Sequence, residues 1–448
     1  MQTHTLLLFI ICAIFGSSAA IANDIPAFPG AEGEGANTPG GRGGTVYLVT
    51  NLQDAGPGSL REACEAEEPR IIVINVSGII ELESPINVSD PFVTIAGQKA
   101  PGDGICLKHF GVNITTHDVI VRHLRIRPGD NAIVETPGLN IANGNRIIID
   151  HCSVSWTTGP AVSVSATSDG VTLQWCMIAE SLFDSDPAAA KRGVGMTLRA
   201  EDATFSVHHN YIAHHNQWAP YLSGTSETSQ PTLDFRNNIL YDWGVGSGDS
   251  GQGALRYNLV GNVYKAGPST ENEVLARALQ IRSYDASIHI IGNDIVGSEM
   301  GSSINFLLLR MPDRFSNRHH QDMLHLDAPF EAEPVQTVQT ATALRRVLAD
   351  SGANRPRRDE VDARIIGQYR LNAGRLVNVP LETGGYPVYE PVDPPLDTDA
   401  DGMPDEWEQM YGLSPSDPAD SAGDVDEDGY TNIEEFLNST SPTVAIEP

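Results

Sequence analysis

The stretch from Val207 to Gly224 gathers side chains that can do chemistry. It reads VHHNYIAHHNQWAPYLSG and holds four histidines beside tyrosine, tryptophan and asparagine. Histidine and tyrosine are common general acids and bases, so His215 and Tyr221 are candidates for proton transfer. Neighbouring side chains on a strand point to opposite faces, so one of His208 and His209 is expected to be structural. The stretch is therefore either an active site or polar packing within a turn.

Two acidic runs near the C-terminus have the spacing of calcium-binding loops. They read DTDADGMPDEWE and DVDEDGYTNIEE, with glycine at position 6 of each. Alternate oxygen ligands surround Ca²⁺ in EF-hand loops, and the carbonyl at position 7 adds another. We therefore predict a calcium-binding module rather than a solvated acidic tail. The expected ligands are Asp397, Asp399, Asp401, Met403, Asp405 and Glu408 in the first loop, and Asp424, Asp426, Asp428, Tyr430, Asn432 and Glu435 in the second.

Charge and length bound the class of protein. The chain has 448 residues and a formal net charge of −30, and the segment from Asp393 onward has 16 acidic residues without lysine or arginine. This balance argues against nucleic acid and anionic membranes as partners. A short apolar run followed by Ala20-Ile21-Ala22 is typical of a secretory signal peptide. We expect a secreted monomer with a signal peptide at 1–22, a main domain at 23–392 and the acidic module at 393–448.

Seven segments in the middle of the chain share one pattern, a β-branched run, a pivot residue and a second apolar run. Their pivots are 24 to 34 residues apart. A repeat of this size, built from short strands, predicts stacked coils that bury one continuous core. The expected fold is all-β, a right-handed parallel β-helix, with a β-sandwich or propeller as the alternative. The pivots are Leu124, Cys152, Cys176, Asn210, Asn238, Asn262 and Asn293.

The pivots are expected to align into a ladder inside the coils. The four asparagine amides would then satisfy backbone groups of the turns. Cys152 and Cys176 would lie on adjacent coils, where two buried thiols are favoured over a disulfide because bridging needs a specific geometry. The repeat stops after about Arg310. The segment from Thr340 to Gly352 is amphipathic and ends in glycine, which predicts a helix on the outside of the coils.

Several motifs carry a resemblance to a known family. They are AFPGAEGEGANTPGGRGG, IAGQKAPGDGICLK, IIIDHCSVSW, VTLQWCMIAESL and VHHNYIAHH. Together they resemble family 1 polysaccharide lyases, the pectate lyases, of the secreted bacterial type with an EF-hand-like tail. The resemblance covers nearly the whole mature chain. It implies a Ca²⁺-dependent enzyme that cleaves an acidic, uronate-containing polysaccharide by β-elimination. A base removes the proton on C5, while calcium and basic side chains neutralise the neighbouring carboxylate.

The sequence departs from the family at the catalytic positions. The family's arginine base falls on Trp218, and its second arginine falls on Tyr221 or Ser223. The carboxylates that hold the family's calcium fall on Gly159 and on Pro160 or Ser163, and another falls near Pro137. Only the substrate lysine is matched, by Lys191 or Arg192. No arginine lies between Asn210 and Gly224.

Three hypotheses remain open. A lyase with a replacement base is the first, a β-helix that binds polysaccharide without cleaving it is the second, and a glycoside hydrolase that uses paired carboxylates such as Asp184 and Asp186 is the third. Glu180 could join these two aspartates in a relocated calcium site or in a solvated turn. For the lyase, the candidate residues are Lys191, Arg192, His215 and Tyr221 in catalysis and Arg127, Arg199 and Trp218 in substrate binding.

Overall fold

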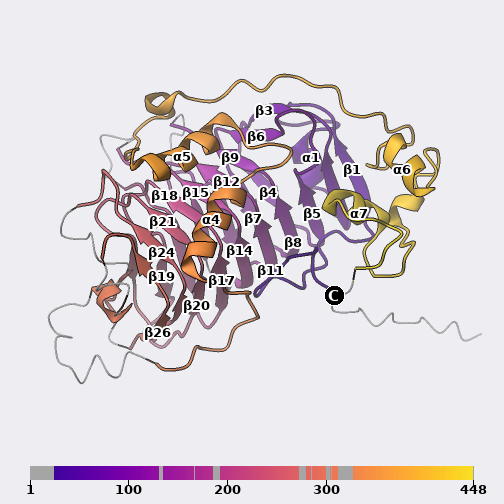
Figure 1. Cartoon of the computed structure of the whole chain (residues 1–448). Coiled ribbons are helices and arrows are strands. Elements are labelled where there is room, and N and C mark those ends of the chain that lie inside the picture. Colours follow the sequence, from indigo (N-terminus) through magenta and orange to yellow (C-terminus); the bar gives the residue numbers. More distant parts are fainter. Residues whose placement is uncertain are drawn as a thin grey trace, which may run out of the picture.

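The chain forms a column of stacked coils built from three sheets (Figure 1). This computed structural model describes residues 25–130, 135–165, 167–184, 192–271, 279–283, 285–298, 303, 305–310 and 326–446. Sheet A contains β1 (Thr45–Val49), β2 (Arg70–Ile74), β5 (Val93–Ala96), β8 (His117–Arg122), β11 (Asn145–Asp150), β14 (Asp169–Gln174), β17 (Thr204–His208), β20 (Thr232–Arg236), β23 (Arg256–Val260) and β26 (Ser287–Ile291).

Sheets B and C complete each coil. Sheet B contains β3 (Gly78–Glu81), β6 (Ile105–Lys108), β9 (Arg125–Arg127), β12 (Ser153–Ser155), β15 (Met177–Ala179), β18 (Tyr211–Ala213), β21 (Ile239–Tyr241), β24 (Val263–Lys265) and β27 (Asp294–Ile295). Sheet C contains β4 (Ile86–Val88), β7 (Val112–Ile114), β10 (Leu139–Ala142), β13 (Val162–Ser165), β16 (Met196–Ala200), β19 (Tyr221–Gly224), β22 (Gly248–Ser250), β25 (Leu279–Gln280) and β28 (Leu309–Arg310).

The strand order confirms the predicted parallel β-helix. The chain runs through sheet C, then sheet A, then sheet B in each coil, and neighbouring coils pair in parallel, so that Ile212 of β18 lies between Ile178 and Leu240. Sandwiches and up-and-down propellers are built on antiparallel pairing, so that alternative was wrong. Inward side chains of all three sheets form one apolar core, which α1 (Leu60–Cys64) closes at the N-terminal end.

A two-residue turn joins sheet A to sheet B in the coils from β8 onward. In β17 to β18 the turn is His209 and Asn210, and the first residue has φ near +55°. Bulky residues rarely adopt this left-handed conformation. Here their rings stack along the column, with His209 on Trp175 at 4.5 Å between ring centroids. His151 and His123 continue the stack.

The second turn residue forms the predicted ladder. The Oδ1 atom of Asn238 accepts from the backbone N–H of Asn210 at 3.0 Å, and Asn262 repeats this toward Asn238 at 2.9 Å. The ladder extends to Asn305, which the repeat pattern did not include. Cys152 and Cys176 are free, buried thiols, as favoured from the sequence.

Other segments cover the outer faces of sheets A and B. Over sheet B lie α4 (Thr340–Asp350), which confirms the predicted helix, and α5 (Glu360–Leu371), which share an apolar cluster with the sheet. Residues 27–36 pack on sheet A. On sheet C, by contrast, the outward row through Asn113, Asn140, Ser163, Thr197 and Tyr221 stays half-buried within the described residues. No helix among the described residues has the length and apolarity to cross a membrane.

The acidic C-terminal segment docks on the first coils of sheet A. It contains α6 (Asp405–Tyr411), α7 (Asn432–Asn438) and a short 3₁₀ turn at Asp420–Ala422. Two further 3₁₀ turns lie outside this segment, at Asn305–Leu308 in the last coil and at Pro380–Thr383. Met403 and Ile433 pack against Ile71 and Val73. Arg42 pairs with the Glu434 carboxylate at 2.9 Å. Apolar contacts and an ion pair therefore hold this segment to the column.

Candidate functional site

The outer face of sheet C carries the predicted aromatic and cationic side chains. Tyr221 lies between Thr197 of β16 and Asp249 of β22 in the strand register. The Trp218 ring stacks on the Tyr221 ring, with centroids 4.6 Å apart and planes 29° apart. Arg199 is exposed two residues beyond Thr197 on β16. Tyr221, Trp218 and Arg199 therefore share one half-exposed face, which we call the sheet C site.

An arginine that the sequence analysis missed belongs to the same face. The Arg282 guanidinium binds the Asp249 carboxylate with two nitrogens, at 2.8 and 2.7 Å. Asp249 is nearly buried, whereas 57% of the Arg282 side chain is exposed. Its hydrogen bond with Asp249 raises the pKa of Arg282, and the neighbouring Tyr221 acts in the same direction. No local motif marks Arg282, because the register of the coils alone brings it beside Tyr221.

The lysine position of the family is only partly described. Lys191 lies outside the described residues. Arg192 is exposed and forms an ion pair with Glu135. A predicted cation is therefore present in the loop between sheets B and C, with an acidic neighbour that any substrate carboxylate would have to displace.

His215 does not reach the surface, which corrects its prediction as a base. The side chain is only 2% exposed, and its Nε2 donates to the carbonyl of Ile178 at 2.9 Å. Burial lowers the pKa of His215 to about 4. A substrate on the outer face of sheet C would not contact the His215 ring, because the ring is buried.

The first histidine pair is also buried. His208 and His209 are 0% and 3% exposed, so both rings are buried, whereas the strand alternation predicted that only one of them would point inward. Burial lowers the pKa of His208 to about 3 and that of His209 to about 4. Both rings are therefore neutral at neutral pH.

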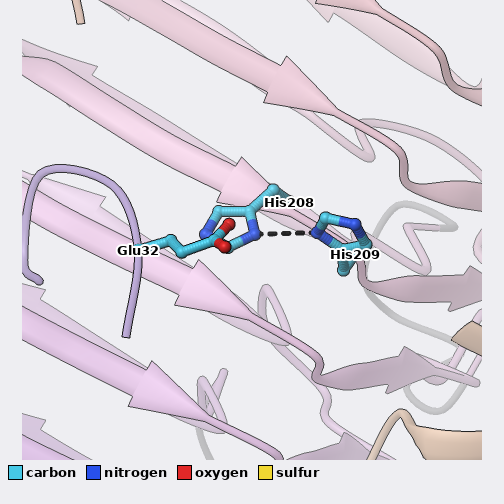
Figure 2. A group of neighbouring side chains, drawn as sticks. All are labelled: Glu32, His208 and His209. Carbon is cyan, nitrogen blue, oxygen red and sulfur yellow. Dashed lines mark hydrogen bonds between the residues drawn. The ribbon is translucent and has the colours of Figure 1, made fainter. Parts of the chain in front are cut away.

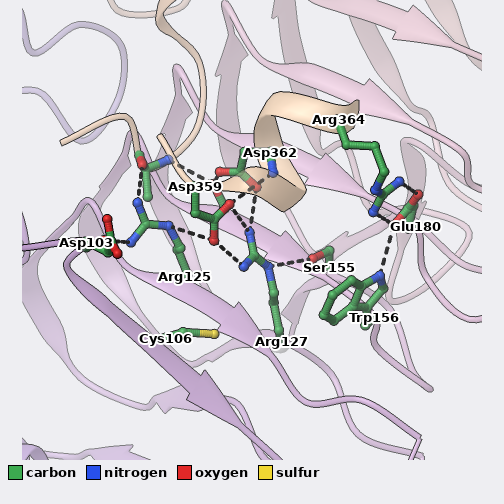
Figure 3. Close-up of polar contacts among 12 residues, drawn as sticks. Asp103, Cys106, Arg125, Arg127, Ser155, Trp156, Glu180, Asp359, Asp362 and Arg364 are labelled. Atoms are coloured by element: carbon green, nitrogen blue, oxygen red, sulfur yellow. Dashed lines mark hydrogen bonds and ion pairs between the residues drawn. The ribbon is translucent and has the colours of Figure 1, made fainter. Parts of the chain in front are cut away.

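Arg127 was predicted to bind substrate, and the structure contradicts this (Figure 3). Its side chain is fully buried on sheet B under α5, where its guanidinium bonds to Asp359 at 2.5 Å and to Asp362 at 2.7 Å. Nε donates to the Ser155 hydroxyl at 3.2 Å. The arginine anchors α5 to the column, and alternation along a short strand could not reveal the helix above it.

The relocated calcium site considered at Glu180 is likewise not formed. Its buried carboxylate accepts from Arg364 at 2.6 Å and from the Trp156 indole at 2.9 Å (Figure 3). Asp186 lies outside the described residues. Glu180 therefore joins α5 to the column and is occupied by a cation of the chain itself.

The first C-terminal loop has the donor set for a calcium ion. Asp397, Asp399 and Asp401 converge on one point, and Asp401 also meets Glu408 and Asp420. Both oxygens of Asp399 and both of Glu408 are buried without a partner among the described residues. Burial and the neighbouring carboxylates raise the pKa of Asp401 and of Glu408 to about 7. A divalent cation bound by these oxygens would give the buried oxygens a partner and would offset the repulsion between the carboxylates.

Asp405 departs from the predicted ligand set. Its two oxygens accept from the backbone N–H and the hydroxyl of Thr398, both at 2.7 Å. Asp420, twelve residues past Glu408, supplies the carboxylate instead. The sequence pattern could not find Asp420, because it lies outside the twelve-residue loop.

The second loop repeats the arrangement of the first. Asp424, Asp426 and Asp428 converge, and both oxygens of Glu435 are buried without a partner among the described residues. The side-chain oxygen of Asn432 is likewise buried without a partner among the described residues. In each loop the first aspartate accepts from the glycine N–H, at 3.0 Å for Gly402 and 2.9 Å for Gly429. The residues of both loops therefore fit calcium, with Met403 and Tyr430 left as predicted carbonyl ligands.

Known proteins resemble this chain over most of its length. No protein-family model matches it. "Probable pectate lyase C" of Aspergillus fumigatus is 34% identical over 426 residues, covering 93% of this chain and 94% of the relative. The protein of the same name from Emericella nidulans is also 34% identical, covering 93% of both. Among solved structures, the major allergen from cedar pollen has 16% identity and a TM-score of 0.48, and covers 72% of this chain and 92% of its own. A variant of Bacillus subtilis pectate lyase has 14% identity and a TM-score of 0.47, and covers 74% and 98%.

Proposed function

The chain belongs to the pectate lyase family, and on this premise we propose that it is an exported lyase that cleaves a uronate polysaccharide by β-elimination at the sheet C site. The observation that carries the proposal is the row on sheet C, where the Tyr221 phenol shares a face left uncovered by the described segments with the exposed Arg199 and Arg282. Export rests on the signal-peptide pattern at 1–22, which lies outside the described residues.

The reaction needs a base, a cation and a platform. Removing the C5 proton leaves negative charge next to the uronate carboxylate, so positive groups must stabilise it. Arg199 and Arg282 would bind that carboxylate, with Arg192 and Lys191 as further cations. Tyr221 would take the C5 proton as phenolate and return a proton to the departing oxygen. Trp218 would stack on a sugar ring.

Calcium has a structural place in this proposal. The two C-terminal loops would hold it through the carboxylates described above, and it would neutralise their mutual repulsion. By the resemblance, the positions of the family's calcium carboxylates fall on Gly159 and on Pro160 or Ser163, none of which carries a carboxylate. We therefore assign carbanion stabilisation to the arginines and not to a metal ion.

The test is the ultraviolet absorbance of unsaturated uronate product from purified protein and a panel of uronate polymers. Product is expected with the wild type, and Tyr221→Phe should lower kcat by about 10² to 10⁴. Tyr47→Phe is the matched control, since this phenol lies on β1 and bonds to Glu68 far from sheet C. Full activity of Tyr221→Phe would remove the tyrosine from the mechanism.

One observation favours non-catalytic binding as the second function. The stacked pair of Trp218 and Tyr221 would serve as a platform for a sugar ring without any chemistry. Binding of a uronate polymer with no absorbance, lost in Trp218→Ala, would support this alternative. New reducing ends without absorbance would indicate a glycoside hydrolase. No contact among the described residues specifically favours that function.

A further inference from the structure

Glu32, His208 and His209 meet where the N-terminal segment crosses sheet A (Figure 2). His208 ends β17, and His209 is the left-handed turn residue that follows. One oxygen of Glu32 and one nitrogen from each ring lie within 4.8 Å of one another. Three metal-ligating groups thus converge outside the sheet C site and outside the calcium loops.

The histidine pair is not satisfied by its own hydrogen bond. The two Nδ1 atoms are 3.0 Å apart, so one of these neutral rings donates to the other. His208 Nε2 is buried and has no partner among the described residues. Whichever ring donates, His208 Nε2 is left without a well-formed hydrogen bond and interacts only with the Glu32 backbone, which costs free energy in a buried position.

Contacts at both ends hold Glu32 beside the rings. Its backbone N–H donates to Gln174 at 3.0 Å, and its carboxylate accepts from the backbone N–H of Gln336 at 2.9 Å. No ion pair among the described residues involves this half-buried carboxylate. Arg236, the residue beside His208 on the neighbouring strand β20, forms an ion pair with Asp234 at 2.7 Å. Glu32 therefore faces two imidazoles without an ion-paired cation among the described residues, while Arg236 and Arg346 act on the histidines.

A second cluster of two histidines and one carboxylate differs in the charge of its neighbours. His123, Asp150 and His151 also converge. Asp150, however, accepts from Arg122 at 2.8 Å, so its charge is already neutralised by the chain. Only the Glu32 cluster combines two imidazoles with a carboxylate that lacks a basic partner among the described residues.

We propose that Glu32, His208 and His209 bind a divalent transition-metal ion of the zinc type. Two imidazoles and one glutamate are a common zinc donor set, with water as a fourth ligand. The His208 nitrogen that the histidine–histidine hydrogen bond leaves unpaired would be one ligand, and a nitrogen of His209 and an oxygen of Glu32 would be the others. The ion would fasten the N-terminal segment to the coils. This inference does not depend on the proposed lyase activity.

The experiment titrates the full chain with Co²⁺ and then Zn²⁺, in saturating calcium so that the C-terminal loops are filled. One Co²⁺ per chain with the visible absorption of a nitrogen–oxygen site is expected, and Zn²⁺ should abolish the absorption. Glu32→Gln and His209→Gln should each weaken binding at least tenfold. His289→Gln is the matched control, because this ring is also buried on sheet A but bonds to the Leu326 carbonyl at 3.0 Å.

Zinc should also raise the thermal midpoint of the wild type and leave that of Glu32→Gln unchanged. Glutamine retains an acceptor for Gln336, so this variant tests the charge without removing the contact. Binding that is equal in wild type, Glu32→Gln and His209→Gln would overturn the proposal, as would absence of Co²⁺ absorption. Binding that disappears in Asp401→Asn/Asp428→Asn would place the metal in the C-terminal loops and overturn it equally.

Discussion

Asn238 lies in the middle of the buried asparagine ladder, and each of its polar atoms is used. It bonds to Asn210, to Asn262 and to the carbonyl of Val207 at 2.8 Å. We expect Asn238→Ala to lower the free energy of unfolding by about 2–3 kcal/mol, because the substitution leaves buried backbone groups unpaired. Asn113→Ala, on the half-buried outer row of sheet C, should change it by about 0.5 kcal/mol or less. Urea unfolding of both variants measures the difference, and equal losses would contradict the ladder's role.

Asp359 offers a test through pH. Burial alone would raise the pKa of this carboxyl, but the Arg127 guanidinium holds it below its ordinary value. The ion pair therefore stabilises the fold above about pH 3.9, the ordinary aspartate pKa, and the stabilisation is lost as the pH falls toward the lower folded pKa.

We expect Asp359→Asn to cost about 3–5 kcal/mol at pH 7 and less at pH 3. Asparagine still caps α5, whose Asp362 N–H bonds to the Asp359 side chain at 3.0 Å, so the variant isolates the charge. Urea unfolding at both pH values measures the cost. Asp327→Asn, at an exposed position, should be neutral at either pH. A cost that grew at pH 3 would contradict the lowered pKa.

At the candidate site, the sequence was informative where the chemistry lies in one segment. Trp218 and Tyr221 are three residues apart and were found together. Arg282 joins them from another coil, and Glu32 reaches His208 from the N-terminal segment, so neither has a local signature. His215 and Arg127 were misassigned for the complementary reason, since a neighbouring coil or helix buries them.

At the scale of elements, α5 is the main cover of sheet B. Ile365 is fully buried between the helix and the sheet, whereas Leu371 at the end of the same helix is 79% exposed. We expect Ile365→Ala to cost about 2–5 kcal/mol and Leu371→Ala about 0.5 kcal/mol or less. Thermal or urea unfolding measures both. Similar costs at the two positions would mean that α5 does not pack on the column in solution.

Amphipathicity in the sequence predicted a helix and its buried face, but not the sheet on which the helix packs. The apolar stripe of Thr340 to Gly352 predicted α4, and its buried Val347 and Leu348 confirm the packing face. Which sheet receives the stripe was not predictable, because sheets A and B both present apolar outer residues. For α5, the sheet is fixed by contacts such as Arg127 with its N-cap Asp359, which are 232 residues apart.

At the scale of the whole molecule, the two loops proposed to bind calcium belong to the segment that packs on the first coils. Removing calcium would leave the clustered carboxylates of both loops to repel one another beneath Met403 and Ile433. A ligand at about 100 times its dissociation constant stabilises a protein by about 2.7 kcal/mol. We expect a chelator to lower the thermal midpoint of the wild type by several degrees for this reason.

Glu408→Gln/Glu435→Gln should have the same thermal midpoint with and without calcium. Calorimetry in calcium and in chelator makes the comparison. A calcium response that persisted in this double variant would place the ion elsewhere. Lyase activity, assayed well below the midpoint, should survive the chelator, because the sheet C site is expected to work without the metal.

The repeat spacing predicted the column but not the source of its unevenness. Spacings from 24 to 34 residues were compatible with a β-helix because the excess residues fall in the links into and out of sheet C. The links from sheet B to sheet C include 156–161 and 180–195, and those from sheet C to sheet A include 143–144 and 225–231, whereas the turn from sheet A to sheet B is two residues long from β8 onward. The ladder and the stacked rings fix that turn, and nothing comparable fixes the links.

The same asymmetry governs how such a protein can diverge. An insertion at the turn from sheet A to sheet B would shift a ladder residue out of line and break the column on both sides of it. An insertion in a link from sheet B to sheet C lengthens a loop whose two ends keep their positions, so the register of every strand pair is preserved. Those links border the sheet C face, so descendants of this chain can acquire new loops around a substrate without a new fold.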